Sequence, residues 1–314
     1  MKLAIIMSGM LRNFEHTYCT TKKYILDDKN FDNIDIFFHG FPSNNDFKNS
    51  SRLFCEMYKP LRYKIEVWND EIKNSIIENT DCINWGNKAR KEYPYPRNSN
   101  LFNVMSAWRC RYLANKLKNE YEEENNFKYD LVYNLRTDWF VFDYIDFKKA
   151  KIANKNKNFI FIPNYWDHKS IHPMAVGDIM AFGSSDVMNQ YYSLYLFAKN
   201  YKDQGVLGHA ETILGAHIKN QNLIRKFCRR NVNREYPYSN SPHDYLWKNW
   251  DKKDLLNKMN IDDNYLKNLE KKSKENLVIN IIKKFILRLR EITLIYYLLK
   301  FIYKIRRTKK NKSL

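Results

Sequence analysis

Short apolar segments recur along the first 200 residues, and each ends in glycine or polar residues. The first three segments are residues 2–7, 34–38 and 63–68. Ser8-Gly9 follows the first of them and His39-Gly40 follows the second. Apolar segments of this length between turn-forming residues are typical of buried β-strands. We therefore predict a strand over each segment, and a helix over residues 13–26 between the first two.

A second pattern begins at residue 100, where apolar side chains recur at helical spacing up to residue 122. This spacing predicts a long amphipathic helix with a charged outer face. The strongest strand signal follows it, over residues 129–135 (YDLVYNL). Further strands are predicted over residues 159–162 and 178–182, and a helix over residues 186–199. Strands that alternate with helices predict an α/β fold with a Rossmann-like, mostly parallel sheet, which binds ligands beyond the carboxyl ends of its strands.

The positive charge of the chain is concentrated at its C-terminal end. The net charge is +19, and residues 272–314 carry thirteen Lys or Arg against two Glu, so +11 of the total lies there. With no long Gly/Ser linker and no internal repeat, we predict one catalytic domain over residues 1–250 and a basic amphipathic helical tail over residues 251–314. Because the remaining residues are only mildly basic, we expect no nucleic-acid partner.

The tail also has an apolar component. Residues 276–305 mix apolar side chains with regularly recurring Lys and Arg, and the longest uncharged run has eight residues. A membrane-spanning helix needs about twenty. We predict that residues 276–314 bind an anionic membrane surface as an interfacial helix; a helix that packs on the catalytic domain or on another copy is the alternative.

Two features concern the cellular compartment. The five cysteines are widely spaced and lack the pairing of zinc ligands or redox pairs, which favours free thiols in a reducing compartment. The apolar run at the N-terminus is too short for a secretory signal. We expect a cytoplasmic protein, peripheral on the inner face of the membrane.

Polar residues at predicted strand ends are the first candidates for chemistry. At Ser8 and Gly9 the backbone can approach a phosphate, and Arg12 can add a charge-assisted contact; an ordinary strand-to-helix turn is the alternative. Arg136 and Asp138 follow the strongest strand. A carboxylate there can bind a divalent cation that bridges two phosphates, and the arginine can neutralise a leaving diphosphate. A structural ion pair is the alternative.

The order of five motifs resembles bacterial and viral glycosyltransferases of the GT-A-like class that build surface polysaccharide or lipooligosaccharide. The motifs are SGMLRNF, DIFFHGF, YDLVYNLRTD, GDIMAFGSSDVM and GHAETILGAHI, over residues 3 to about 220. The resemblance implies a nucleotide-sugar donor and a glycan or lipid-linked acceptor. It places Asp138 as the remaining acid of an Asp-x-Asp motif that binds Mn²⁺ or Mg²⁺, with Arg136 where the first acid is expected. That difference is equally compatible with a metal-independent site.

The resemblance also assigns roles to two later carboxylates. Asp178 would shape the sugar pocket and Glu211 would lie on the acceptor side. An inverting enzyme needs a carboxylate that takes the proton of the acceptor hydroxyl, and both residues are candidates. The alternatives are a polar residue that begins a strand, for Asp178, and an acid favoured by the helix dipole, for Glu211.

Other polar groups are weaker candidates. His39, His209 and His217 lack metal-ligand spacing and are expected to be structural or surface residues. A basic cluster can bind a diphosphate or an anionic acceptor, or form a solvated helix face; it consists of Arg225, Lys226, Arg229, Arg230 and Arg234. The competing functions are a sugar nucleotidyltransferase and a non-catalytic nucleic-acid- or membrane-binding protein.

Overall fold

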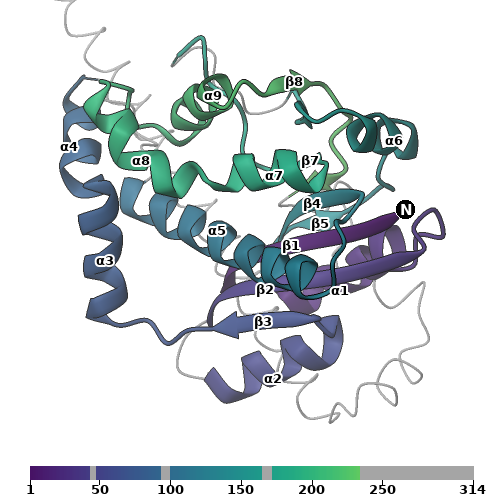
Figure 1. Ribbon diagram of the computed structural model, residues 1–314. Coiled ribbons are helices and arrows are strands. Elements are labelled where there is room, and N and C mark those ends of the chain that lie inside the picture. The colour runs from purple at the N-terminus through teal and green to yellow at the C-terminus, as the bar shows by residue number, and fades with distance from the viewer. Residues whose placement is uncertain (43–46, 93–99, 165–171, 234–314) are drawn as a thin grey trace, which may run out of the picture. The chain divides into compact units, whose positions relative to one another are not determined.

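The computed structural model describes residues 1–42, 47–92, 100–164 and 172–233 (Figure 1). The chain divides into two units, Met1–Asn249 and Trp250–Leu314, and every described residue belongs to the first. The predictions for the tail, for its membrane-binding residues 276–314 and for Arg234 lie outside the described residues. In the part that is described, no helix is long and apolar enough to cross a membrane.

A mostly parallel, seven-stranded sheet organises the described residues. Its strand order is β3-β2-β1-β4-β7-β6-β8. The strands are β1 Lys2–Leu11, β2 Asn33–Pro42, β3 Arg62–Ile65, β4 Leu131–Arg136, β6 Phe159–Phe161, β7 Ala181–Gly183 and β8 Ile224–Lys226. Only β7 runs antiparallel to its neighbours, and a small second sheet pairs β5 Phe140–Val141 with β9 Val232–Asn233. The predicted α/β class with a mostly parallel sheet is confirmed.

The first strands extend further than their apolar runs suggested. Pairing between β1 and β2 continues through Ser8–His39 and Gly9–Gly40 to Leu11–Pro42. Ser8 and Gly9 therefore lie inside β1, and not in a turn that follows it. The extension requires glycine twice: Gly9 has φ +104°, and a Cβ on Gly40 would lie 1.8 Å from the Gly9 carbonyl oxygen.

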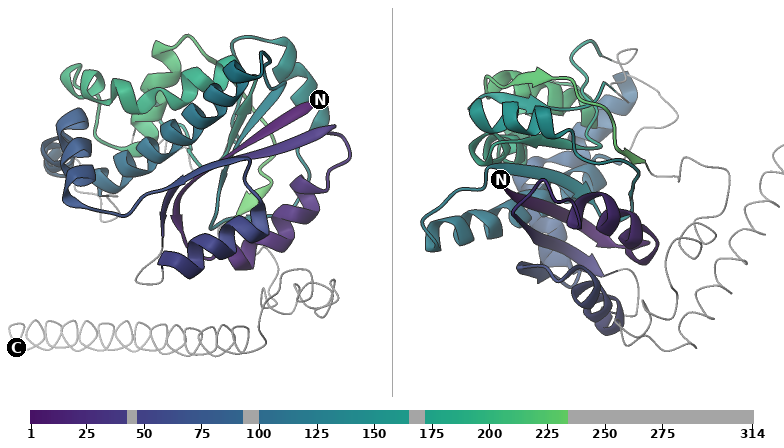
Figure 2. Two further views of the ribbon diagram at one scale, coloured as in Figure 1. Left: turned by 60° about the horizontal axis from the view of Figure 1, so that its bottom comes forward. Right: turned by 90° about the vertical axis from the view of Figure 1, so that its right-hand side faces the viewer.

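Helices cover both faces of the sheet. They are α1 Phe14–Thr21, the π-helix η1 Lys22–Leu26, α2 Phe47–Tyr58, α3 Asp70–Thr80, α4 Cys82–Glu92, α5 Leu101–Glu124, α6 Phe147–Lys155, α7 Ser185–Tyr192, α8 Leu194–Asp203 and α9 Ala210–Asn220. Helices α1 and α2 lie on one face and α5 lies on the other, against β1 and β2 (Figure 2). The chain thus leaves β1 in one direction, toward β2 and β3, and returns through α5 to β4 on the other side of β1. This reversal of strand order marks the place where open α/β sheets bind ligands.

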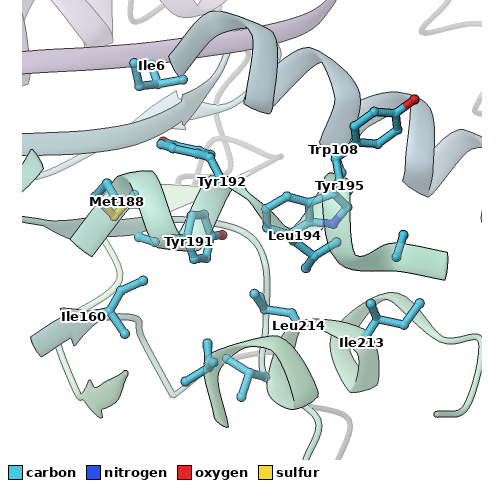
Figure 3. Packing of buried hydrophobic residues seen from close by; sticks show 14 of the residues in the cluster. Ile6, Trp108, Ile160, Met188, Tyr191, Tyr192, Leu194, Tyr195, Ile213 and Leu214 are labelled. Carbon is cyan, nitrogen blue, oxygen red and sulfur yellow. The ribbon is translucent and has the colours of Figure 1, made fainter. Parts of the chain in front are cut away.

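Helix α5 packs against α7 and α8 in the main hydrophobic core. Trp108 of α5 contacts Tyr191 of α7 edge-to-face at 5.2 Å, near Leu194 (Figure 3). The predicted helix over residues 186–199 is in fact α7 and α8. It is interrupted at Ser193, whose hydroxyl donates to the Gln190 carbonyl.

The prediction that the charged residues of α5 face outward is wrong in part. Arg111, Lys118 and Glu122 are buried together with Trp108. Lys118 Nζ lies 3.1 Å from Glu122 Oε2 and donates to Asn189 Oδ1 at 3.0 Å. Burial lowers the pKa of Lys118 to about 8, although the charge of Glu122 acts in the opposite direction. The inward face of α5 thus carries an ion pair and its hydrogen bonds among its apolar residues.

Candidate functional site

A cleft of 640 Å³ opens at the carboxyl ends of β1, β2 and β4. It is lined by six of the seven residues that the sequence predicts for the site: Ser8, Gly9, Arg12, Arg136, Asp138 and Asp178. Parallel pairing explains the convergence, because Ser8 of β1 lies opposite Arg136 of β4 and opposite His39 of β2. Glu211 lies outside the lining.

The segment after β4 is fixed by hydrogen bonds to β1 and α1. Thr137 Oγ1 donates to the Met10 carbonyl at 3.1 Å, and Thr17 Oγ1 of α1 donates to the Thr137 carbonyl at 2.6 Å. Thr137 and Thr17 are both buried. These bonds hold Asp138, the next residue, at the floor of the cleft.

Asp138 forms an arginine–carboxylate cluster with Arg12 and Arg136. Arg136 donates from Nε to Oδ1 at 2.9 Å and from Nη2 to Oδ2 at 3.0 Å. Arg12 reaches Oδ2 with Nε and Nη2, both at 2.8 Å. Burial alone would raise the pKa of Asp138, but the hydrogen bonds and charges of Arg136 and then Arg12 hold that pKa below its ordinary value. Asp138 is therefore an ionised carboxylate between two cations.

This geometry does not fit the predicted metal ligand. A cation would take an oxygen of Asp138 at about 2.1 Å, yet both oxygens already accept from guanidinium groups. A dication about 4 Å from a guanidinium is repelled by about 8 kcal/mol at an effective dielectric constant of 20. In the part of the chain that the structure describes, no group of three or more His, Cys, Asp or Glu side chains could hold a metal ion.

Arg111 belongs to the cleft and was missed in the sequence. Its Nη1 donates to Asp178 Oδ2 at 3.1 Å and its Nη2 to the Asp178 carbonyl at 3.3 Å, while the guanidinium lies 4.5 Å from the centre of the Trp108 ring. Arg111 is buried and the side chain of Asp178 is 28% exposed. The arginine therefore fixes the position of Asp178, which lines the cleft. Its position three residues after Trp108, on the buried stripe of α5, is the signal that could have identified it.

Glu211 lies at the first turn of α9, close enough to Asp178 for their charges to interact. Its main-chain carbonyl accepts from Val176 N–H at 2.9 Å, which links α9 to the segment before Asp178. Burial, and then the charge of Asp178, raise the pKa of Glu211 to about 7. His209 Nε2 lies 3.0 Å from Glu211 Oε2. Glu211 is thus a carboxyl group that exchanges its proton near neutral pH, close to Asp178.

Three aromatic residues, Phe41, Trp68 and Phe102, form an aromatic wall on the β2–β3 side of the cleft. Trp68 contacts Phe41 at 4.9 Å and Phe102 at 5.8 Å, both edge-to-face. Trp68 remains 42% exposed although it lines the cleft. Phe41 ends the motif DIFFHGF and Trp68 ends the predicted strand over residues 63–68, but neither signal indicated that these aromatic side chains meet in one wall.

The histidines and the described residues of the basic cluster do not line the cleft. His217 is buried between the Tyr201 hydroxyl at 2.8 Å and the Gln190 carbonyl at 2.7 Å, and burial lowers its pKa to about 4. Burial likewise lowers the pKa of His39 to about 4. Within the described residues, Arg225 donates to the Pro163 carbonyl and its neighbours in the basic cluster do not line the cleft.

Comparisons with known proteins leave the family open. No protein-family model matches the chain, and no curated protein matches it in sequence. Among solved structures it is similar to mouse xyloside xylosyltransferase 1 in its apo form, with a TM-score of 0.37 and 11% identity, over 73% of this chain and 85% of that one. A similarity at this level does not decide function, so the function is argued from the cleft itself.

Proposed function

We propose that the protein is a glycosyltransferase that moves a sugar from a nucleotide-sugar donor to a glycan or lipid-linked saccharide acceptor. The observation that supports this proposal is the composition of the cleft. Its β2–β3 side carries the aromatic wall, and its β1–β4 side carries the arginine–carboxylate cluster. Neighbouring strands lie about 4.8 Å apart, so β3 and β4 are separated by about 14 Å. A nucleotide has a matching arrangement, with a planar base at one end and phosphates at the other.

The donor would bind with its base against Trp68 and its diphosphate against Arg12 and Arg136. Aromatic side chains stack on bases, and guanidinium groups form paired hydrogen bonds with phosphate oxygens. As the bond between the sugar carbon and the diphosphate oxygen breaks, the electron pair leaves on the diphosphate. The arginines would stabilise the negative charge that develops there.

The acceptor hydroxyl forms the new bond to the sugar carbon and must release its proton. Asp178 and Glu211 are the proposed carboxylates for this side of the reaction. Asp178 lines the cleft and is held in place by Arg111, which makes it a good anchor for sugar hydroxyls. Glu211, with a pKa of about 7, is better suited to accept a proton near neutral pH.

A turnover assay tests the proposal. The full chain is mixed with a panel of nucleotide sugars and with saccharide acceptors, and release of nucleoside diphosphate is measured. We expect one donor to be turned over, with a loss of about 10²-fold or more in Glu211→Gln. Glu78→Gln, on the exposed side of α3, is the matched control and should retain full activity. Pyrophosphate release from a nucleoside triphosphate and a sugar phosphate would instead identify a nucleotidyltransferase.

The membrane partner and the location at the inner face of the membrane remain proposals about residues 276–314. They are supported by the +11 charge of residues 272–314 and by the apolar positions between the basic ones. Co-sedimentation of the full chain with anionic vesicles, and its absence with neutral vesicles, is the expected result. Equal binding to both vesicle types would contradict an electrostatic contribution.

A further inference from the structure

We propose that the cleft holds the diphosphate of its ligand through Arg12 and Arg136 without a bridging divalent cation, and that Asp138 is the positioning residue that orients these two guanidiniums. The inference rests on the proposed function for the ligand class, a nucleotide diphosphate. It goes beyond that function by stating how the anion is held and by giving Asp138 a role other than metal ligand.

The Asp138 carboxylate is held between two guanidinium groups. Both oxygens of Asp138 accept hydrogen bonds from arginine nitrogens at 2.8 to 3.0 Å, and its side chain is only 7% exposed. Oδ2 accepts from both arginines and Oδ1 accepts from Arg136, so a metal ion at either oxygen would lie against a guanidinium whose positive charge repels it. The neighbouring Thr137 is fixed to β1 and α1, so the carboxylate itself has little freedom to turn elsewhere.

Arg12 and Arg136 have N–H groups that do not bond to Asp138. A guanidinium has five N–H groups in a planar fork. Arg12 and Arg136 each direct the Nε–Nη2 edge at Asp138, and within the described residues Nη1 of each has no hydrogen-bond partner. Their side chains are 46% and 30% exposed and both line the cleft. Asp138 thus aligns two forks whose opposite edges are available for phosphate oxygens.

The cleft has open space at Gly9. Gly9 lines the cleft beside these arginines, and a Cβ there would have no neighbouring atom within 4 Å. An anion in the cleft can therefore approach the β1 backbone at Gly9. Arg111 is the third arginine of the cleft, but it is occupied by Asp178. The anion site consequently has two donors with free edges, Arg12 and Arg136.

Inorganic pyrophosphate is the probe that tests this inference. The full chain is titrated calorimetrically with pyrophosphate in EDTA and again with Mn²⁺ in excess. We expect binding in EDTA, with an affinity that differs by less than about threefold when Mn²⁺ is present. Arg12→Gln and Arg136→Gln should each weaken binding by about tenfold or more in both conditions, because each removes charged hydrogen bonds. Arg52→Gln, on the exposed face of α2, is the matched control and should bind like wild type.

The variant Asp138→Asn separates positioning from metal binding. It should change pyrophosphate affinity by the same factor in EDTA and in Mn²⁺. Asp138→Glu keeps the carboxylate and should return the affinity part of the way to the wild-type value. The inference is overturned if binding requires Mn²⁺ and Asp138→Asn affects only the Mn²⁺ titration, or if no pyrophosphate binds in either condition. Cation-free pyrophosphate binding in a protein that turns over no nucleotide sugar would support this inference and reject the transferase function.

Discussion

Replacing Glu211 by glutamine is expected to raise the free energy of unfolding at pH 8 by about 3 kcal/mol. In the folded protein, burial and the charge of Asp178 raise the pKa of Glu211 from its ordinary value of 4.5 to about 7. Each tenfold change in proton affinity corresponds to about 1.4 kcal/mol, which gives the expected magnitude. Glutamine has the same shape and carries no charge, so the variant removes the penalty of a partly buried anion.

The effect should depend on pH in a defined direction. Between pH 4.5 and 7 the folded state keeps a proton on Glu211 that the unfolded chain has released, so the free energy of unfolding of the wild type falls as the pH rises. Below pH 4.5 both states are protonated and the penalty is absent, whereas above pH 7 it is complete. The advantage of Glu211→Gln should therefore grow by about 2.5 kcal/mol between pH 5 and pH 8.

Urea unfolding followed by circular dichroism at pH 5, 6, 7 and 8 measures this difference. Glu78→Gln is the control, because its side chain is exposed on α3, and it should stay within about 0.5 kcal/mol of wild type at every pH. A difference between Glu211→Gln and wild type that does not change with pH would refute the raised pKa. A variant that is less stable than wild type at pH 8 would show that the contact with His209, 3.0 Å away, outweighs the cost of burying the Glu211 carboxylate.

Three further substitutions test the cleft and the sheet. Trp68→Ala should weaken nucleoside diphosphate binding by about tenfold and leave pyrophosphate binding unchanged, as calorimetry would show, because stacking on a base contributes about 1–3 kcal/mol; equal losses for both ligands would contradict the aromatic wall. Arg111→Ala should lower the free energy of unfolding by about 3 kcal/mol in urea titrations, since it leaves Asp178 without its buried cation; a neutral effect would contradict this. Gly40→Ala should destabilise by about 3 kcal/mol, because its Cβ would overlap the Gly9 carbonyl, and wild-type stability would disprove that close contact.

Six of the seven strands of the large sheet could be predicted from sequence because each overlaps an apolar run, whereas β8, which has one apolar residue, and the two-residue strands β5 and β9 were not predicted. The strand lengths could not be predicted, because the extension of β1 to Leu11 depends on pairing with β2 residues about thirty positions later in the chain. Helix α5 was located well by its spacing, but its inward face was not. Arg111 and Lys118 are buried on the stripe of Trp108, where partners from Asp178 and Glu122 satisfy their charges. The i,i+4 pair of Lys118 with Glu122 is visible in the sequence, but the pair of Arg111 with Asp178, 67 positions apart, is visible only after the chain has folded.

In the candidate site, too, some residues could be predicted from sequence and others could not. Arg136 and Asp138 could be placed in it because they follow a buried strand, and parallel pairing then brings Ser8 beside Arg136. The contact between Arg12 and Asp138 joins residues 126 positions apart, so the sequence alone could not reveal that the carboxylate is occupied. Trp68 was missed because its role depends on sheet order, which places the end of β3 beside β2.

The central claim is that the cleft at the ends of β1, β2 and β4 binds a nucleotide sugar. Calorimetric titration of the full chain with a panel of nucleoside diphosphates and nucleotide sugars tests it most directly, with Arg136→Gln and Arg52→Gln measured in parallel. We predict binding of one nucleotide class that weakens by about tenfold in Arg136→Gln and is unchanged in Arg52→Gln. No binding of any nucleotide, or binding that Arg136→Gln leaves unchanged, would contradict the claim.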